Sequence, residues 1–397
     1  MSPIPARCLF RRVRMLSLSA VLTLLVPSLS AHAQTYTVIH SFAGKPTDAS
    51  YPNGELIQDE AGNFYGTSFV GGAYGYGTVF KMDSNGNVTI LHSFDENHGQ
   101  DPAAGLLSDG QGNFYGTTKQ TVFRLDANNN LKNLHELDGY GGVETTSRMV
   151  TINGDLYFVA WRGGNGTGCT GGCGQILKMT KDGTETVLYN FTGGADGANP
   201  QGTFRDAAGN LYGVASYGGI GFGTVWKLDT SGVFSVLYTF TGGPDGANPW
   251  GRLIRDTNGN IHGVTWAGGD PTCDCGVVFR LDANGHETVL HKFFGENAPQ
   301  PRVGLLDVGG TLYGMTALGG DLTCRPPIGC GVLYQISKTG QYTVLHRFTG
   351  APGDGANSES GGPTLGKDGS IYGTTWEGGT TCPEDSYGCG VIFKYTP

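Results

Sequence analysis

The sequence predicts an all-β protein, a seven-bladed β-propeller with four antiparallel strands in each blade. Three observations support this fold. Glycine accounts for 69 of the 397 residues, more than twice its average share, which indicates many turns and short strands. Apolar residues still make up 38% of the chain and aromatic residues 11%, so the chain can bury a core and is not disordered. Three short phrases, rich in aromatic residues, recur seven times in a fixed order.

The first 33 residues differ from the rest and are expected to form a signal peptide. Four arginines precede an apolar stretch from about Met15 to Leu29, and Ala31 and Ala33 place small residues where a signal peptidase cuts. No second long apolar segment follows. We therefore expect residues 34–397 to form a single propeller domain that is secreted or periplasmic, with no insertion into a membrane.

The charge and the cysteines narrow the class of partner. Removal of the signal peptide takes away four arginines and no acid, which changes the formal net charge from −9 to −13. Nucleic acids and anionic membranes are bound through basic patches, so we expect neither as a partner. The removal also leaves eight cysteines, and an even number in an oxidising compartment favours disulfide bonds.

The repeats supply three of the four strands of each blade, named A to D from the axis outwards. Strand D is the phrase at Val38–Phe42, Leu91–Phe94, Leu134–Leu137, Leu188–Phe191, Leu237–Phe240, Leu290–Phe293 and Leu345–Phe348. Strand B is the phrase at Asn63–Thr67, Asn113–Thr117, Asp155–Tyr157, Asn210–Gly213, Asn260–Gly263, Thr311–Gly314 and Ser370–Thr374. Strand C is the phrase at Gly77–Lys81, Thr121–Arg124, Gln175–Lys178, Thr224–Lys227, Val277–Arg280, Val332–Tyr334 and Val391–Lys394.

A fourth β-type run, such as Leu56–Gln58 or Leu253–Arg255, precedes strand B and is separated from it by a tight turn of Asp, Gly and Asn. Four short antiparallel strands in each repeat are typical of a propeller blade. The residues after position 33 begin with a strand D phrase and the chain ends on a strand C phrase. Pairing Tyr36–Phe42 beside Val391–Tyr395 would close the ring and remove both exposed edges.

The phrases Asn-Leu-Tyr-Gly, Gly-Gly and Gly-Thr-Val-Phe-Lys resemble the GloVer-type tandem repeat, a family of exported bacterial proteins expected to be propellers. The resemblance covers the whole chain after the signal peptide. It implies the propeller architecture and carries over no catalytic motif.

The connections between strands indicate where a ligand would bind. In an antiparallel meander the A–B and C–D turns share one face, and here they are all short. The D–A and B–C loops share the other face and carry nearly all the variation in length. Because loops on a rigid scaffold commonly carry function, this variable face is the expected binding face.

The cysteines fall in the four longest B–C loops, two in each. The second cysteine always takes the place that Tyr76 or Phe222 holds in the short loops. Of the possible pairings this register favours four local disulfides: Cys169–Cys173, Cys273–Cys275, Cys324–Cys330 and Cys382–Cys389. Zinc is the alternative for such cysteines, but no histidine accompanies them, so we expect no metal and no cofactor.

One repeat position at the start of the B–C loops differs from blade to blade and carries the candidate ligand-binding residues. It holds three of the five tryptophans. Exposed Trp faces stack on sugars and other flat ligands, and charged neighbours fix their orientation. The candidates are Phe69, Lys119, Trp161, Arg162, Trp266, Trp376 and Glu377. The alternative is that each tryptophan only packs between neighbouring blades. In blade 2, Lys119 and Gln120 join the strands almost directly.

Other polar residues have simpler interpretations. Most histidines share a strand D position with tyrosines and are expected to belong to the scaffold, as are the aspartates of the Asp-Gly-Ala-Asn loops. Glu55 and Arg252 interrupt a glycine-rich position of strand A and are expected to project into the central channel.

Together these features predict an exported propeller that binds a glycan or a cell-surface partner through its loop-rich face, as a monomer. A polysaccharide lyase or another glycan-cleaving enzyme is the first alternative, and a structural or adhesive surface module is the second. The catalytic residues of an enzyme are unknown from the sequence. Convergence of His98, Arg252 or Arg302 with a tyrosine in one pocket would favour the lyase.

Overall fold

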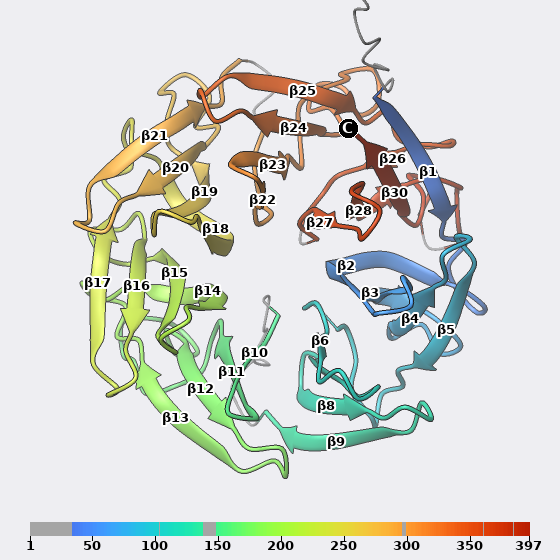
Figure 1. The fold of residues 1–397 in the computed structure, drawn as a ribbon, viewed down its shortest axis with the longest axis horizontal. Helices are drawn as coiled ribbons and strands as arrows, with labels where there is room; N and C mark the ends of the chain where they lie inside the picture. The colour runs from blue at the N-terminus through green and yellow to red at the C-terminus, as the bar shows by residue number, and fades with distance from the viewer. Residues whose placement is uncertain (1–33, 103, 138–147, 296–298, 360, 384) are drawn as a thin grey trace, which may run out of the picture. The chain divides into compact units, whose positions relative to one another are not determined.

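The strands of residues 34–397 form seven four-stranded antiparallel sheets arranged around an axis, as Figure 1 shows. The computed structural model describes residues 34–102, 104–137, 148–295, 299–359, 361–383 and 385–397. The predicted signal peptide, residues 1–33, lies outside the described residues, and the contacts divide the chain at the same point, after Ala33. The predicted number of blades and strands is confirmed.

The first four blades are built from consecutive strands. Blade 1 contains β2 (Ala49–Gln58), β3 (Phe64–Gly71), β4 (Thr78–Met82) and β5 (Val88–Ser93). Blade 2 contains β6 (Leu107–Ser108), β7 (Phe114–Thr117), β8 (Thr121–Leu125) and β9 (Leu131–Glu136). Blade 3 contains β10 (Val150–Ile152), β11 (Asp155–Ala160), β12 (Gln175–Met179) and β13 (Glu185–Asn190). Blade 4 contains β14 (Ala198–Arg205), β15 (Leu211–Tyr217), β16 (Thr224–Leu228) and β17 (Phe234–Thr239).

The remaining blades complete the ring. Blade 5 contains β18 (Ala247–Arg255), β19 (Ile261–Ala267), β20 (Val277–Leu281) and β21 (Glu287–Lys292). Blade 6 contains β22 (Leu306–Val308), β23 (Thr311–Met315), β24 (Val332–Ile336) and β25 (Tyr342–Arg347). Blade 7 contains β27 (Thr364–Leu365), β28 (Ile371–Thr375), β30 (Val391–Thr396) and, as its outermost strand, β1 (Thr35–Ser41). A small ribbon of β26 (Gly355–Ala356) and β29 (Glu377–Gly378) is added beside blade 7.

The ring closes as the sequence predicts. Strand β1 pairs antiparallel with β30, with Tyr36 opposite Tyr395 and Ser41 opposite Val391. The two outermost strands of every blade also share one irregularity, a shift of register at the same repeat position, as between Val79 and Phe80. Such bulges increase the local twist of a sheet. The first and the last strand of the propeller thus form one blade.

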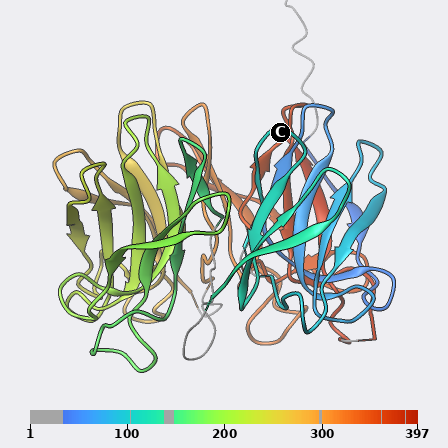
Figure 2. The same ribbon diagram turned by 90° about the horizontal axis from the view of Figure 1, so that it is seen from below.

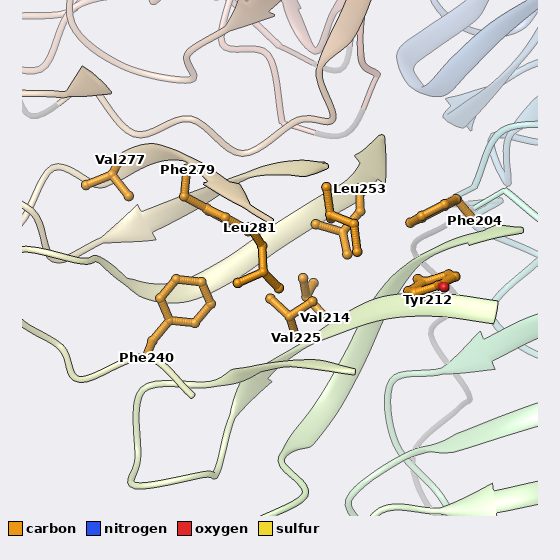
Figure 3. Close-up of a cluster of buried hydrophobic side chains, with 10 residues drawn as sticks. Phe204, Tyr212, Val214, Val225, Phe240, Leu253, Val277, Phe279 and Leu281 are labelled. Atoms are coloured by element: carbon orange, nitrogen blue, oxygen red, sulfur yellow. The ribbon is translucent and has the colours of Figure 1, made fainter. Parts of the chain in front are cut away.

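Apolar side chains are buried between blades. The described residues contain seven hydrophobic clusters, and each joins the two blades on either side of one junction. At the junction of blades 4 and 5, for example, Val225 and Phe240 pack with Leu253 and Phe279, as Figure 3 shows. The core of the molecule is therefore divided into seven parts, one at each junction.

Candidate functional site

The two faces of the ring differ in the length of their connections. In Figure 2 the strands run between the two faces, and the turns and loops project from both. We call the face that carries the D–A and B–C loops the loop-rich face, and the opposite one the short-turn face. Of the twelve exposed large apolar side chains in the described part of the chain, eight lie in, or at the start of, loops of the loop-rich face: Tyr74, Tyr217, Ile220, Phe222, Phe294, Leu322, Ile328 and Tyr387. Two thirds of these exposed side chains therefore lie on the loop-rich face, which makes it the candidate binding face.

Trp376 lies at the centre of an aromatic cluster on this face. Its ring is half-buried and stacks on that of Tyr51, with centroids 5.1 Å apart and an interplanar angle of 3°. Phe69 contacts the same indole at 5.3 Å and 44°. Trp376 comes from blade 7, and the other two residues come from blade 1. The tryptophan thus bridges two blades and still keeps part of its surface exposed.

Trp266 lies further round the same face, in contact with a charged group. The guanidinium of Arg302 lies 5.5 Å from the centre of the Trp266 ring, within the range of a cation–π interaction. Arg302 also donates a hydrogen bond of 2.8 Å to Gln300 Oε1 and forms an ion pair of 3.5 Å with Glu359.

A chain of contacts connects these two groups. Asn357 donates a hydrogen bond of 3.4 Å to Glu359 and accepts one of 2.8 Å from the backbone N–H of Trp376. We call Trp266, Arg302, Glu359, Trp376, Tyr51 and Phe69 the aromatic arc. It runs from blade 5 through blades 6 and 7 to blade 1, with the Arg302–Glu359 ion pair between Trp266 and the cluster around Trp376.

The other candidate residues lie outside the arc. Trp161 and Arg162 are on blade 3, where the guanidinium lies 4.7 Å from the indole centre. Lys119 is half-buried on blade 2, and its N–H donates to the backbone oxygen of Gln100. The carboxylate of Glu377 is buried, and Arg325 pairs with it at 2.5 Å. Burial raises the pKa of Glu377 despite Arg325. Its carboxyl group is directed to that arginine within the protein.

Tyr51, Arg302 and Glu359 were not among the predicted ligand-binding residues. Tyr51 offers a signal that the sequence contains. Its φ is positive, at 56°. The residues at the same repeat position also have a positive φ: Asp101, Asn199, Asn248 and Asn357. An aromatic residue at a position that otherwise holds Asp or Asn is unusual, because those two side chains tolerate this conformation best.

The four predicted disulfides are present: Cys169–Cys173, Cys273–Cys275, Cys324–Cys330 and Cys382–Cys389. The second cysteine does share a structural position with Tyr76 and Phe222. At five junctions, the carbonyl of this residue accepts a hydrogen bond of 2.8–3.0 Å from the positive-φ residue that begins the next blade. The donor and acceptor pairs are Tyr51–Cys389, Asp101–Tyr76, Asn199–Cys173, Asn248–Phe222 and Asn357–Cys330.

The histidines and loop aspartates form scaffold contacts where the structure describes them. Asp354 accepts hydrogen bonds from His346 at 2.9 Å and from Tyr36 at 2.7 Å, and His40 bonds Asp48 at 3.2 Å. Within the described ranges, no group of three or more His, Cys, Asp or Glu side chains could hold a metal ion. No helix there is long and apolar enough to cross a bilayer.

The residues named for the lyase hypothesis are not brought together. His98 bonds Asp95 at 2.8 Å, and Arg302 pairs with Glu359 in the arc. Arg252 donates a hydrogen bond of 2.9 Å to Glu55. Glu55 and Arg252 hold equivalent positions on the inner strands of blades 1 and 5, so this ion pair spans the ring at its axis. Arg148, on blade 3, is a third charged residue at this point, and it was not among the residues predicted for the channel.

Comparison with known proteins identifies a repeat family and a fold. The sequence model of the Gloeobacter/Verrucomicrobia repeat matches residues 25–221 and, again, residues 165–383. No curated protein sequence matches this chain. A streptogramin B lyase structure is similar with a TM-score of 0.59 at 13% identity, over 91% of this chain and 97% of the lyase. A chain in the structure of the Mitotic Checkpoint Complex gives a TM-score of 0.56 at 11% identity, over 98% of this chain and 99% of that one.

A third similar structure is the extracellular domain of a one component system from B. thetaiotaomicron, with a TM-score of 0.58 and 14% identity. The match covers 89% of this chain but 40% of that one, so this chain spans less than half the length of that protein. At such identities the likeness shows a shared propeller fold and does not extend to activity.

Proposed function

This chain belongs to the Gloeobacter/Verrucomicrobia repeat family, and we propose that it is a ligand-binding propeller that holds a glycan on its aromatic arc. The observation that carries the proposal is the arc itself. It has the Trp266 indole at one end and the cluster of Trp376, Tyr51 and Phe69 at the other, connected through the Arg302–Glu359 ion pair and Asn357. Aromatic faces stack on the apolar faces of sugar rings, and charged and amide groups between them hydrogen-bond the hydroxyls.

The rest of the loop-rich face supports the same proposal. Tyr387 is 51% exposed, and the guanidinium of Arg325 lies 4.9 Å from the centre of its ring. This cation–π contact holds the ring in place although half of its surface faces solvent. The disulfides of blades 3, 5, 6 and 7 anchor the longest loops of this face. A surface that is aromatic and already ordered loses little conformational entropy on binding. We also propose that the protein works in an oxidising compartment outside the cytoplasm, where such disulfides persist.

A glycan array followed by calorimetry with the best ligand tests this function. We expect Trp376→Ala and Trp266→Ala to weaken binding about tenfold each, since each removes one stacking surface. Val233→Ala is the control, because Val233 is 57% exposed but lies on the short-turn face. Absence of any glycan binding, or equal losses in the control, would contradict the proposal. Appearance of an unsaturated uronate product would favour the lyase instead.

A further inference from the structure

A funnel opens at the centre of the short-turn face, away from the aromatic arc. It has a volume of about 730 Å³ and is lined by the inner strands or adjoining residues of blades 2 to 6. This volume lies within the range of about 300–1,000 Å³ that is usual for small-molecule sites. Four arginines line it: Arg148, Arg205, Arg252 and Arg255. Four cationic side chains in one hollow are notable in a chain whose formal net charge is −9.

Two of these arginines share one carboxylate. Arg252 Nε donates to Glu55 Oε1 at 2.9 Å. Burial lowers the pKa of Arg148, Glu55 raises it and Arg252 lowers it further, so the three charges interact. Burial alone would raise the pKa of Glu55, but Arg252 and Arg148 outweigh it and hold the pKa below its usual range. Glu55 thus interacts with both guanidinium groups.

The other charged groups of the funnel form hydrogen bonds with neighbours of their own. Arg205 donates a hydrogen bond of 3.0 Å to the backbone oxygen of Thr151, and Arg255 donates one of 3.2 Å to Asp206. Asp256 accepts hydrogen bonds from Asn260 and His262 in its own turn. Asp206 is held in the same way by Asn210 and Tyr212, and Asp307 by the N–H of Gly310. At the axis, by contrast, Arg148 and Arg252 both act on the single carboxylate of Glu55, two cations on one acid among the described residues.

We propose that the funnel binds a small oxyanion, with a carboxylate or phosphate group seated between Arg148 and Arg252. A half-buried guanidinium without a full counter-charge is unfavourable, and an oxyanion supplies that charge. The planar fork of donors on an arginine matches two oxygens of a carboxylate or a phosphate at once. The site is independent of the glycan proposed for the loop-rich face, because the two lie on opposite faces of the ring.

Calorimetry with inorganic phosphate, D-galacturonate and neutral D-galactose tests this site. We expect binding of at least one anion and none of galactose, and the comparison of phosphate with galacturonate identifies which oxyanion is preferred. Arg148→Gln is expected to weaken anion binding about tenfold, the value of one charge-assisted hydrogen bond. Glu55→Gln is expected to strengthen it, because the competing carboxylate is removed. No anion binding to the wild-type protein would overturn the proposal.

Two further variants separate binding from folding and from net charge. Arg347→Gln makes the same change of charge on an exposed residue of β25, and it should leave the affinity unchanged. An equal loss in Arg347→Gln and Arg148→Gln would overturn the site. The double variant Glu55→Gln/Arg252→Gln removes both members of this ion pair, so Arg252 is lost without leaving Glu55 as an unpaired acid. Loss of binding in a double variant that still unfolds cooperatively supports a direct role of Arg252. Trp376→Ala should retain anion binding, which keeps this test distinct from that of the glycan.

Discussion

At the scale of single residues, one strand D position explains most of the histidines. The histidine or tyrosine at this position packs against the first residue of the outermost strand in the next blade. Tyr189 stacks on Phe234 at 3.9 Å, and His291 stacks on Tyr342 at 4.0 Å. A ring that is stacked and partly buried in this way contributes to the junction between blades rather than to catalysis.

Glu287 departs from this pattern and should make stability depend on pH. It holds the position of Phe234 and Tyr342 but carries a carboxyl group. Burial, and then the charge of Asp245, raises its pKa to about 7. Between its unfolded pKa and this value the folded protein keeps a proton that the unfolded chain releases, so stability is lost as the pH rises through about 7.

We expect Glu287→Gln to remove much of that dependence. The midpoint of urea unfolding, measured from about pH 5 to about pH 8, should fall less steeply in the variant than in the wild-type protein. Glu136→Gln makes the same change on an exposed strand residue and is the control. Identical pH profiles for the wild-type protein and Glu287→Gln would contradict the assignment.

At the scale of elements, the inner strands touch one another through glycine. Gly202 has a φ of +59°, and a Cβ at this position would overlap the backbone oxygen of Gly251 in the next blade. A side chain on Gly54 would likewise meet the backbone of Gly105. The glycines of strand A therefore allow neighbouring blades to approach at the axis.

Gly202→Ala should destabilise the ring by more than about 3 kcal/mol, because it combines the strain of a positive φ with a backbone overlap. Gly340→Ala is the matched control. Its φ is also positive, +83°, but no atom lies within 4 Å of the added methyl. We expect that variant to cost about 1 kcal/mol, and urea unfolding measures both. Equal losses would mean that the axial contact contributes nothing.

The strands could be predicted because each has a sequence pattern that recurs in every blade. The candidate sites lie at the positions where one blade differs from the others. Trp266 and Trp376 break a pattern, and that break is what made them candidates in the sequence. Arg148 was missed because the inner strand of blade 3 has lost the glycine that marks this strand elsewhere. The pairing of Glu55 with Arg252 joins residues 197 positions apart, and only the geometry of the ring brings them within 2.9 Å.

At the scale of the whole molecule, the stability of the fold depends on contacts between blades and therefore on the complete ring. Each of the seven clusters needs two blades, so a single blade has no core of its own. Strand β1 completes the last blade and brings Tyr36 onto His346, with ring centroids 3.5 Å apart. The same tyrosine donates a hydrogen bond of 2.7 Å to Asp354. We therefore expect unfolding in one cooperative transition.

Tyr36 tests the contribution of ring closure. Tyr36→Phe should cost about 1–2 kcal/mol through the lost hydrogen bond, and Tyr36→Ala about 3–5 kcal/mol, since it also empties the junction. Tyr74→Ala is the control, because Tyr74 is 63% exposed in a loop. Tryptophan fluorescence and circular dichroism should report the same midpoint for each variant. A Tyr36→Ala protein as stable as the control would show that closure by β1 contributes little.

The backbone contact between neighbouring blades has a consequence for engineering. At five junctions, the anchor that the B–C loop offers to the next blade is a main-chain carbonyl, supplied by Tyr76, by Phe222 or by a cysteine. Everything between strand B and that carbonyl can change in length without altering the junction. We therefore expect that a B–C loop can be transplanted from one blade to another. The ring could then serve as a scaffold that displays designed recognition segments.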